Sequence, residues 1–221
     1  MPRRGGGRAP AGVGAQAGRT QPTHADNAVQ ALGLFGFDRQ LPTVYVTGGA
    51  QGAQQINELI GGVLPWLLRT ANVVHQCGPD NVDGLRARAS GLPAELQARY
   101  HLTGFVGPEL PDVLALADVV LSRSGAGTLA ELTALGKPAV FVPLASSAGN
   151  EQAYNARHLQ EAGAAVALEG DVTADQLREA VGPLLADAHL RRAMAERARA
   201  YGRPDAADRL VDEILSVAAP G

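Results

Sequence analysis

Cysteine is almost absent from this sequence, which has Cys77 alone among its 221 residues. A single cysteine cannot form an intramolecular disulfide, and such usage is typical of a reducing compartment. Long apolar runs are also missing: residues 63–68 are interrupted by Pro65 and fall far short of the roughly 20 residues that span a bilayer. We therefore expect a cytoplasmic protein without a membrane span, which reaches the inner face of the plasma membrane only through a partner.

An excess of charge of one sign is lacking as well. The formal net charge is -3, so no overall field attracts the chain to nucleic acid or to anionic lipid. The histidines lack metal-ligand spacing, and no Asp-x-Asp pair is present to hold a cation against a diphosphate. Neither a Gly-x-Ser-x-Gly turn nor a base partner for Cys77 is recognisable. The sequence therefore predicts no metal site, no cofactor, no nucleic-acid partner and no catalytic nucleophile.

Large apolar and acidic residues are scarce in the first part of the chain, residues 1–24. Such a stretch cannot bury enough surface to offset the entropy of ordering it, so we predict a disordered arm rich in glycine, arginine and proline. Its four arginines leave open a second interpretation, a basic arm that binds phosphate. A short helix is predicted over residues 25–34, and residues 25–221 are predicted to form one domain.

From residue 43 onward, short β-branched or apolar runs alternate with amphipathic stretches. Strands are predicted at residues 43–47, 72–76, 100–103, 119–122, 139–143 and 164–168. Helices are predicted at 53–68, 82–89, 111–116, 150–162, 173–185, 189–201 and 205–217, and a further one carries Leu129, Leu132 and Leu135, which are spaced three apart. Strands that are apolar on both faces and alternate with helices predict an α/β fold, a doubly wound, Rossmann-like parallel sheet. Glycines follow four of the strands, and the carboxyl ends of such strands bind ligands, so these turns indicate one cleft.

The stretch Ser122–Glu131 reads S-R-S-G-A-G-T-L-A-E and joins a predicted strand to a predicted helix. Its glycines allow close approach of a ligand, and the following helix N-terminus favours an anion. We interpret it as a phosphate-binding turn. The six residues from Gly125 also satisfy the dinucleotide fingerprint G-x-G-x-x-A. However, they follow the fourth strand instead of the first, and no acidic residue stands at the next strand end, which weakens the NAD interpretation.

Three other features near this turn each have a structural interpretation beside a ligand-binding one. The turn at residues 48–52 is either a phosphate loop or a tight connection, and the lack of a following Gly-Lys-Ser/Thr excludes a P-loop NTPase. Glu131 is either a ligand-binding carboxylate or a complement to its helix dipole. Arg123 is either a surface charge or a phosphate clamp, a role that suits the bidentate geometry of guanidinium.

Seven motifs taken together resemble one family. They are TGGAQGAQQIN (47–57), HQCG (75–78), GFV (104–106), ADVVLSRSGAGTLAEL (117–132), GKPAVFVP (136–143), NEQAYNA (150–156) and PDAADRL (204–210). In this order they resemble the C-terminal, donor-binding half of the MurG family, the bacterial UDP-N-acetylglucosamine transferases that make lipid II. The resemblance extends over about residues 25–217.

This resemblance implies one half of a GT-B glycosyltransferase that is inverting and metal-independent, with UDP-GlcNAc as donor and a lipid-linked acceptor. It implies that the backbone near Phe105 and Val106 reads the uracil and that Glu131 accepts hydrogen bonds from the ribose. The two glycine turns would hold the diphosphate with Arg123 nearby, and residues 151, 152 and 155 would face the sugar. The implied donor-binding residues are Gly48, Gly49, Gln51, Gly52, Phe105, Val106, Arg123, Ser124, Gly125, Ala126, Gly127, Thr128, Glu131, Glu151, Gln152 and Asn155.

Departures from the family pattern limit this expectation. Ala50 stands where the family usually has serine, and Glu151 stands where glutamine or histidine is frequent. The N-terminal half, which in the family carries the acceptor site, the membrane-facing patch and the base, is not recognisable. We therefore expect the chain to bind donor better than it transfers sugar, and we predict no catalytic residue in it. The alternatives are a non-catalytic UDP-sugar-binding module and a GT-B transferase with a different UDP-sugar or acceptor lipid.

Overall fold

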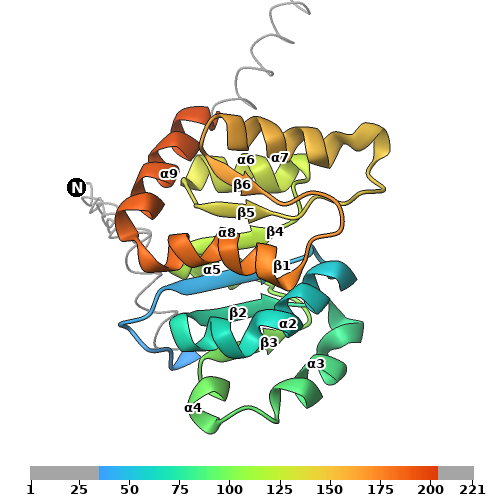
Figure 1. Ribbon diagram of the computed structural model, residues 1–221, viewed down its shortest axis with the longest axis vertical. Coiled ribbons are helices and arrows are strands. Elements are labelled where there is room, and N and C mark those ends of the chain that lie inside the picture. Colours follow the sequence, from blue (N-terminus) through green and yellow to red (C-terminus); the bar gives the residue numbers. More distant parts are fainter. Residues whose placement is uncertain (1–34, 204–221) are drawn as a thin grey trace, which may run out of the picture.

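The computed structural model describes residues 35–203, so the predicted arm at residues 1–24 and the predicted helices at 25–34 and 205–217 lie outside it (Figure 1). The strands are β1 (Thr43–Thr47), β2 (Asn72–Gln76), β3 (Tyr100–Thr103), β4 (Val119–Ser122), β5 (Ala139–Phe141) and β6 (Ala165–Ala167). The α-helices are α2 (Gln54–Thr70), α3 (Val82–Ala89), α4 (Ala94–Gln97), α5 (Leu110–Leu116), α6 (Ala126–Leu135), α7 (Glu151–Glu161), α8 (Ala174–Ala186) and α9 (Ala188–Tyr201). Two 3-10 turns, η1 (Pro79–Asn81) and η2 (Ala148–Asn150), precede α3 and α7.

These elements confirm the predicted alternation. Strands β1 to β4 have the predicted bounds, whereas β5 and β6 are shorter than predicted. Helix α4 and the two 3-10 turns were not predicted, because three or four residues are too few for a helical apolar period to appear.

The six strands form one parallel sheet in the order β3-β2-β1-β4-β5-β6, which Figure 1 shows from bottom to top. After β3 the chain crosses back to place β4 beside β1, so growth of the sheet reverses between these two strands. This reversal is the topological switch point at which doubly wound sheets bind ligands. The expected α/β, Rossmann-like fold is confirmed.

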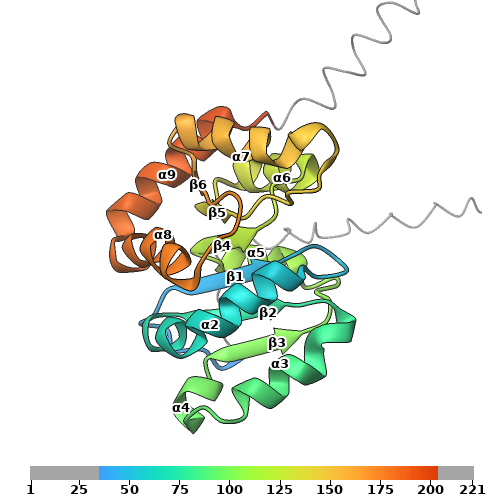
Figure 2. The ribbon, with the colours of Figure 1, turned by 45° about the vertical axis from the view of Figure 1, so that its right-hand side comes forward.

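Helices cover both faces of the sheet (Figure 2). Alternation along β1 places Val44 and Val46 in the core under α2 and α8, and Tyr45 in the core under α5, α6 and α7. In α2, Ile56, Ile60 and further apolar residues three or four apart form a buried stripe that packs on the sheet. The period of each element thus directs its apolar side chains to the interior.

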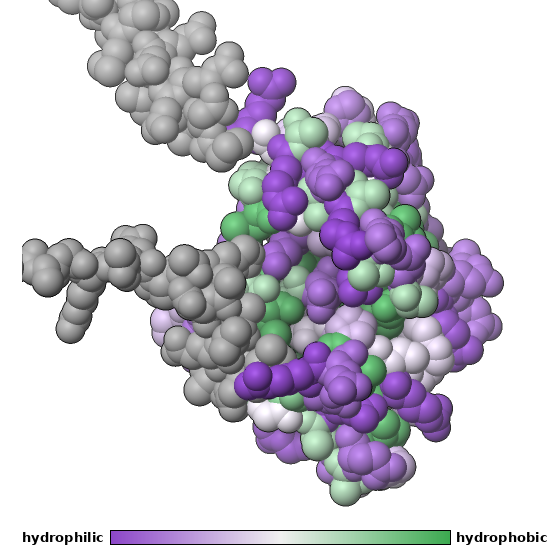
Figure 3. Space-filling model, turned by 90° about the vertical axis from the view of Figure 1, so that its left-hand side faces the viewer, coloured by the Kyte–Doolittle hydropathy of each residue, from purple (hydrophilic) through white to green (hydrophobic). Residues whose placement is uncertain are grey.

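No helix within residues 35–203 is long and apolar enough to cross a membrane. On the face of the molecule shown in Figure 3, hydrophilic side chains predominate, with hydrophobic ones in small groups between them.

Candidate functional site

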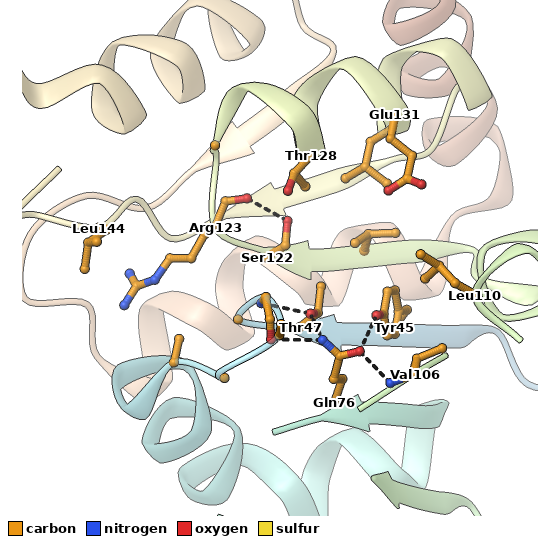
Figure 4. A pocket seen from close by; sticks show the side chains of 18 of the residues that line it. Tyr45, Thr47, Gln76, Val106, Leu110, Ser122, Arg123, Thr128, Glu131 and Leu144 are labelled. Atoms are coloured by element: carbon orange, nitrogen blue, oxygen red, sulfur yellow. Dashed lines mark hydrogen bonds between the residues drawn. The ribbon is translucent and has the colours of Figure 1, made fainter. Parts of the chain in front are cut away.

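A cleft of about 700 Å³ opens at the carboxyl ends of the strands, at the switch point between β1 and β4. Its walls come from the turn after β1, the segment after β3, the turn after β4 and the start of α6, and the segment after β5. In Figure 4, Thr128 and Glu131 of α6 lie on one side of the cleft, opposite Tyr45, Thr47 and Gln76. Segments far apart in sequence therefore meet where the fold predicts a ligand.

Most of the predicted site residues line this cleft. Those that line it are Gly48, Gly49, Gly52, Phe105, Val106, Arg123, Gly125, Thr128, Glu131 and Gln152. Those that do not are Gln51, Ser124, Ala126, Gly127, Glu151 and Asn155.

Ser124 and Asn155 join the β4–α6 turn to α7. The buried Ser124 hydroxyl donates to the carbonyl oxygen of Gln152 at 2.7 Å, and Asn155 Nδ2 donates to the carbonyl oxygen of Ser124 at 3.1 Å. Glu151 is exposed, and its Oε1 accepts from Asn155 Nδ2 at 3.4 Å. Gln152 lines the cleft while its Oε1 accepts from the backbone N–H of Leu144 at 3.0 Å.

Helices α2 and α6 begin at the cleft without a negative charge or a side-chain cap. Their N-caps are Ala53 and Gly125, neither helix has an acidic residue in its first turn, and no side chain accepts from their first N–H groups. The other α-helices within residues 35–203 have either an acidic residue in the first turn or, in α9, the Asp187 side-chain cap. Two positive dipole ends thus face one cleft, and neither is compensated by its own first turn or by a side-chain cap from residues 35–203.

The turn after β1 is shaped by contact with the turn after β2. A Cβ on Gly52, whose φ is +75°, would lie 1.9 Å from the carbonyl oxygen of Cys77, and one on Gly78, whose φ is +87°, would lie 2.2 Å from that of Gln51. We expected the turns at Gly78 and Gly104 to point at the cleft. The Gly104 turn does so through Phe105 and Val106, whereas the turn at Gly78 does not, and neither glycine lines the cleft itself. Gly78 and Gly104 instead allow neighbouring backbone segments to pack closely, and this packing supports the turns that line the cleft.

Arg123 is half-buried at the cleft, and hydrogen bonds to three other residues fix the position of its guanidinium. Its Nη1 donates to the carbonyl oxygens of Val142 at 2.8 Å and Pro143 at 2.9 Å, and to Gln55 Oε1 at 2.9 Å. Burial lowers the pKa of the guanidinium from its ordinary value of 12.5. The ion pairs among the described residues do not include Arg123, so the carboxylates of this part of the chain leave its charge unpaired.

Tyr45, Thr47 and Gln76 line the cleft although the motifs did not assign them a role. The Gln76 side chain, 5% exposed, bonds to both Thr47 and the Val106 backbone. A signal for it existed, since a glutamine ends an otherwise apolar strand within the HQCG motif. Burial raises the pKa of the Tyr45 hydroxyl; the Thr47 hydrogen bond opposes this rise and the negative charge of Glu131 adds to it.

No group of three or more His, Cys, Asp or Glu side chains within residues 35–203 is placed to hold a metal ion.

A parallel sheet with two uncompensated helix N-termini at its switch point is typical of domains that bind a nucleotide diphosphate. Residues 43–210 match the model of the Glycosyltransferase family 28 C-terminal domain, and the chain belongs to this family.

Relatives confirm the resemblance to the MurG family. UDP-N-acetylglucosamine--N-acetylmuramyl-(pentapeptide) pyrophosphoryl-undecaprenol N-acetylglucosamine transferase of Streptomyces coelicolor is 37% identical over 192 residues, which cover 86% of this chain and 51% of the relative. The protein of the same name from Prosthecochloris aestuarii is 39% identical over 193 residues, which cover 86% of this chain and 50% of that relative. The chain thus spans about half the length of these relatives.

Solved structures agree with the fold. The crystal structure of Acinetobacter baumannii MurG has a TM-score of 0.73 at 30% identity, covering 80% of this chain and 52% of that chain. WaaG, a glycosyltransferase involved in lipopolysaccharide biosynthesis, has a TM-score of 0.61 at 18% identity, which shows a shared fold alone. The architecture is therefore that of one half of a GT-B glycosyltransferase.

Proposed function

We propose that this chain is the donor-binding half of a glycosyltransferase that moves GlcNAc from UDP-GlcNAc to a lipid-linked acceptor, converting lipid I to lipid II in peptidoglycan synthesis. The observation that carries the proposal is the convergence of α2 and α6, whose N-termini have no carboxylate and no side-chain cap. A diphosphate would place its negative charge between two positive dipole ends. The names of the relatives support the choice of sugar and acceptor.

The remaining groups of the nucleotide sugar are assigned along the cleft. Glu131 accepts hydrogen bonds from the ribose hydroxyls, and the segment at Phe105 and Val106 binds the uracil. Gln152 faces the sugar, with Glu151 and Asn155 beside it on α7. Support for the uracil assignment comes from the Phe105 side chain, which is 61% exposed at the cleft and offers an apolar surface to a planar base.

In the proposed reaction the acceptor hydroxyl displaces UDP with inversion at the anomeric carbon and without a metal ion. The two helix N-termini and Arg123 stabilise the charge that develops on the departing diphosphate. Among residues 35–203, Glu131 is the acidic residue that lines the cleft, and it is assigned to the ribose. The base and the acceptor site are therefore expected from a partner half.

Titration calorimetry of the full chain with UDP-GlcNAc, once with Mg²⁺ and once with a chelator, tests the proposal. We expect equal binding in both conditions and weaker binding of UDP-glucose. Absence of UDP-GlcNAc binding, or binding only with Mg²⁺, would overturn it.

A transfer assay with lipid I distinguishes the enzyme half from a non-catalytic UDP-sugar-binding module. We expect negligible turnover by the chain alone and measurable turnover when the N-terminal half of a relative is added. Robust turnover by the chain alone would contradict the need for a partner half. Donor binding without turnover in any combination would favour the module.

A further inference from the structure

Gln76 lies beneath the cleft, between the segments assigned to opposite ends of the nucleotide. Its Nε2 donates to Thr47 Oγ1 at 3.1 Å and to the carbonyl oxygen of Gly49 at 2.9 Å. Its Oε1 accepts from the backbone N–H of Val106 at 2.8 Å and from the Tyr45 hydroxyl at 3.5 Å. One buried amide therefore bonds to the glycine turn on one side and to the base segment on the other, as Figure 4 shows.

The orientation of this amide is determined by its partners. The Val106 N–H can only donate and the Gly49 carbonyl can only accept, so exchanging the oxygen and nitrogen of Gln76 would break both bonds. A carboxylate of the same length has no hydrogen to donate to Gly49 or Thr47. The position thus requires a donor and an acceptor together.

The bonds form a continuous chain across the cleft floor. The Gly49 N–H donates to Thr47 Oγ1 at 3.0 Å, the same oxygen accepts from Gln76 Nε2, and Gln76 Oε1 accepts from the Val106 N–H. A shift of the glycine turn when phosphate binds would therefore move the Val106 N–H as well. The Gly49 end of this chain is exposed, whereas Gln76 at its centre is buried and fully bonded, and buried amides bonded in this way hold their partners in one arrangement.

We propose that Gln76 is a positioning residue that couples diphosphate binding at the glycine turn to the arrangement of the base-binding segment. This inference rests on the proposed function, because it takes the Gly48–Gly52 turn as the phosphate site and Val106 as part of the base site. Gln76 contributes by keeping the two sites in register before the nucleotide arrives, which lowers the cost of ordering them on binding.

Affinity is the first test. In Gln76→Glu, which keeps the size, removes the donor and adds a negative charge, we expect UDP affinity measured by calorimetry to fall by about tenfold, because the Gly49 carbonyl loses its partner and the carboxylate repels the diphosphate. The matched control is Gln97→Glu, since the exposed Gln97 Nε2 also donates to two backbone carbonyls, those of Ser90 and Leu92, away from the cleft. Equal UDP affinity in Gln76→Glu and wild type would overturn the proposal.

The second test measures coupling between the glycine turn and the base-binding segment. A residue that only stabilised the fold would not transmit a shift from one to the other. Inorganic pyrophosphate is titrated into ¹⁵N-labelled protein, and the amide signals of Gly49 and Val106 are followed by NMR. In the wild type both signals should shift with the same saturation curve, whereas in Gln76→Glu the Val106 signal should stay in place. If the Val106 signal does not shift in the wild type, or shifts equally in Gln76→Glu, the proposed coupling is wrong.

Two further measurements keep the outcome clear. Thr47→Val removes one of the two links between Gly49 and Gln76 and leaves the direct bond from Gln76 Nε2 to the Gly49 carbonyl, without changing side-chain size. It should therefore reduce the shift of the Val106 signal, and this variant can be measured even if Gln76→Glu fails to fold. Wild-type protein that binds no UDP would overturn the proposed function and this inference with it. Wild-type protein that binds UDP without coupling would overturn this inference alone.

Discussion

Arg123 Nη1 donates a 2.9 Å hydrogen bond to Oε1 of Gln55, and this bond joins the β4–α6 turn to the first turn of α2. Gln55 in turn donates from Nε2 to the carbonyl oxygen of Gly170 at 3.1 Å. The two helix N-termini that face the cleft are thus tied together by a cation and an amide. Their relative position is built into the protein before any ligand binds.

Replacing Arg123 with lysine should distinguish the effect of its positive charge from the effect of its hydrogen-bonding geometry. Nη1 alone bonds to Gln55, Val142 and Pro143, which leaves Nη2 and Nε for a phosphate. A lysine ammonium keeps the positive charge but has one nitrogen for both tasks, so we expect UDP affinity to fall by about tenfold. Uridine, which has no phosphate, should bind the variant and the wild type alike. Calorimetry with both ligands checks this, with the exposed Arg178→Lys as control. Equal losses for UDP and uridine would contradict a phosphate role.

Replacing Glu131 with alanine should weaken UDP binding by about 1 to 3 kcal/mol, because charge-assisted hydrogen bonds to the ribose are lost. Glu131→Gln keeps an acceptor and should lose less. The control is Glu161→Ala, which removes an exposed carboxylate at the end of α7. Calorimetric titration of the three variants tests the assignment, and wild-type affinity in Glu131→Ala would refute it.

Replacing Gly52 with alanine should destabilise the fold by several kcal/mol, on the order of 3 kcal/mol or more, because its Cβ would overlap the carbonyl of Cys77 at a positive φ. Gly84→Ala is the matched control, since Gly84 lies in α3 and a Cβ there meets nothing within 4 Å. That change should stabilise the protein by about 0.5 to 1 kcal/mol. Urea denaturation of both variants measures the difference; equal effects would show that the turn relaxes easily.

His75 should make stability depend on pH. Burial lowers the pKa of its imidazole from 6.5 to about 4. Its Nε2 lies 3.0 Å from Asn57 Oδ1 and its Nδ1 lies 2.8 Å from the Tyr100 hydroxyl. Asn57 Nδ2 donates to the carbonyl oxygen of Cys77, so Oδ1 is the acceptor and Nε2 carries the proton. The folded state therefore holds the neutral ring.

As the pH falls below 6.5, the unfolded chain protonates His75 while the folded protein does not, so stability decreases toward pH 4 by about 3 kcal/mol. Above pH 6.5 the ring is neutral in both states and contributes no pH dependence. Urea denaturation of wild type and His75→Gln at about pH 7.5 and about pH 4.5 isolates this contribution. An identical pH dependence in both proteins would contradict it.

Much of the fold could be predicted from the sequence because its signals are local. Apolar runs bounded by glycine predicted β1 to β4 with the observed bounds. The glycine turns at Gly48 and Gly125 were likewise recognisable, because close approach of a ligand to the backbone favours that residue. Helix α4 escaped prediction, since it is too short to show a period.

The sequence by itself determined the α/β class, the family and the two turns that flank the cleft, because spacing and residue type are properties of short segments. Only the tertiary structure decided what lies between them. Gly78, expected at the cleft, instead packs on Gln51, and Gln76 at the end of β2 joins the end of β1 to the segment after β3. Such relationships depend on the parallel order of the strands, which brings together residues that the chain keeps far apart.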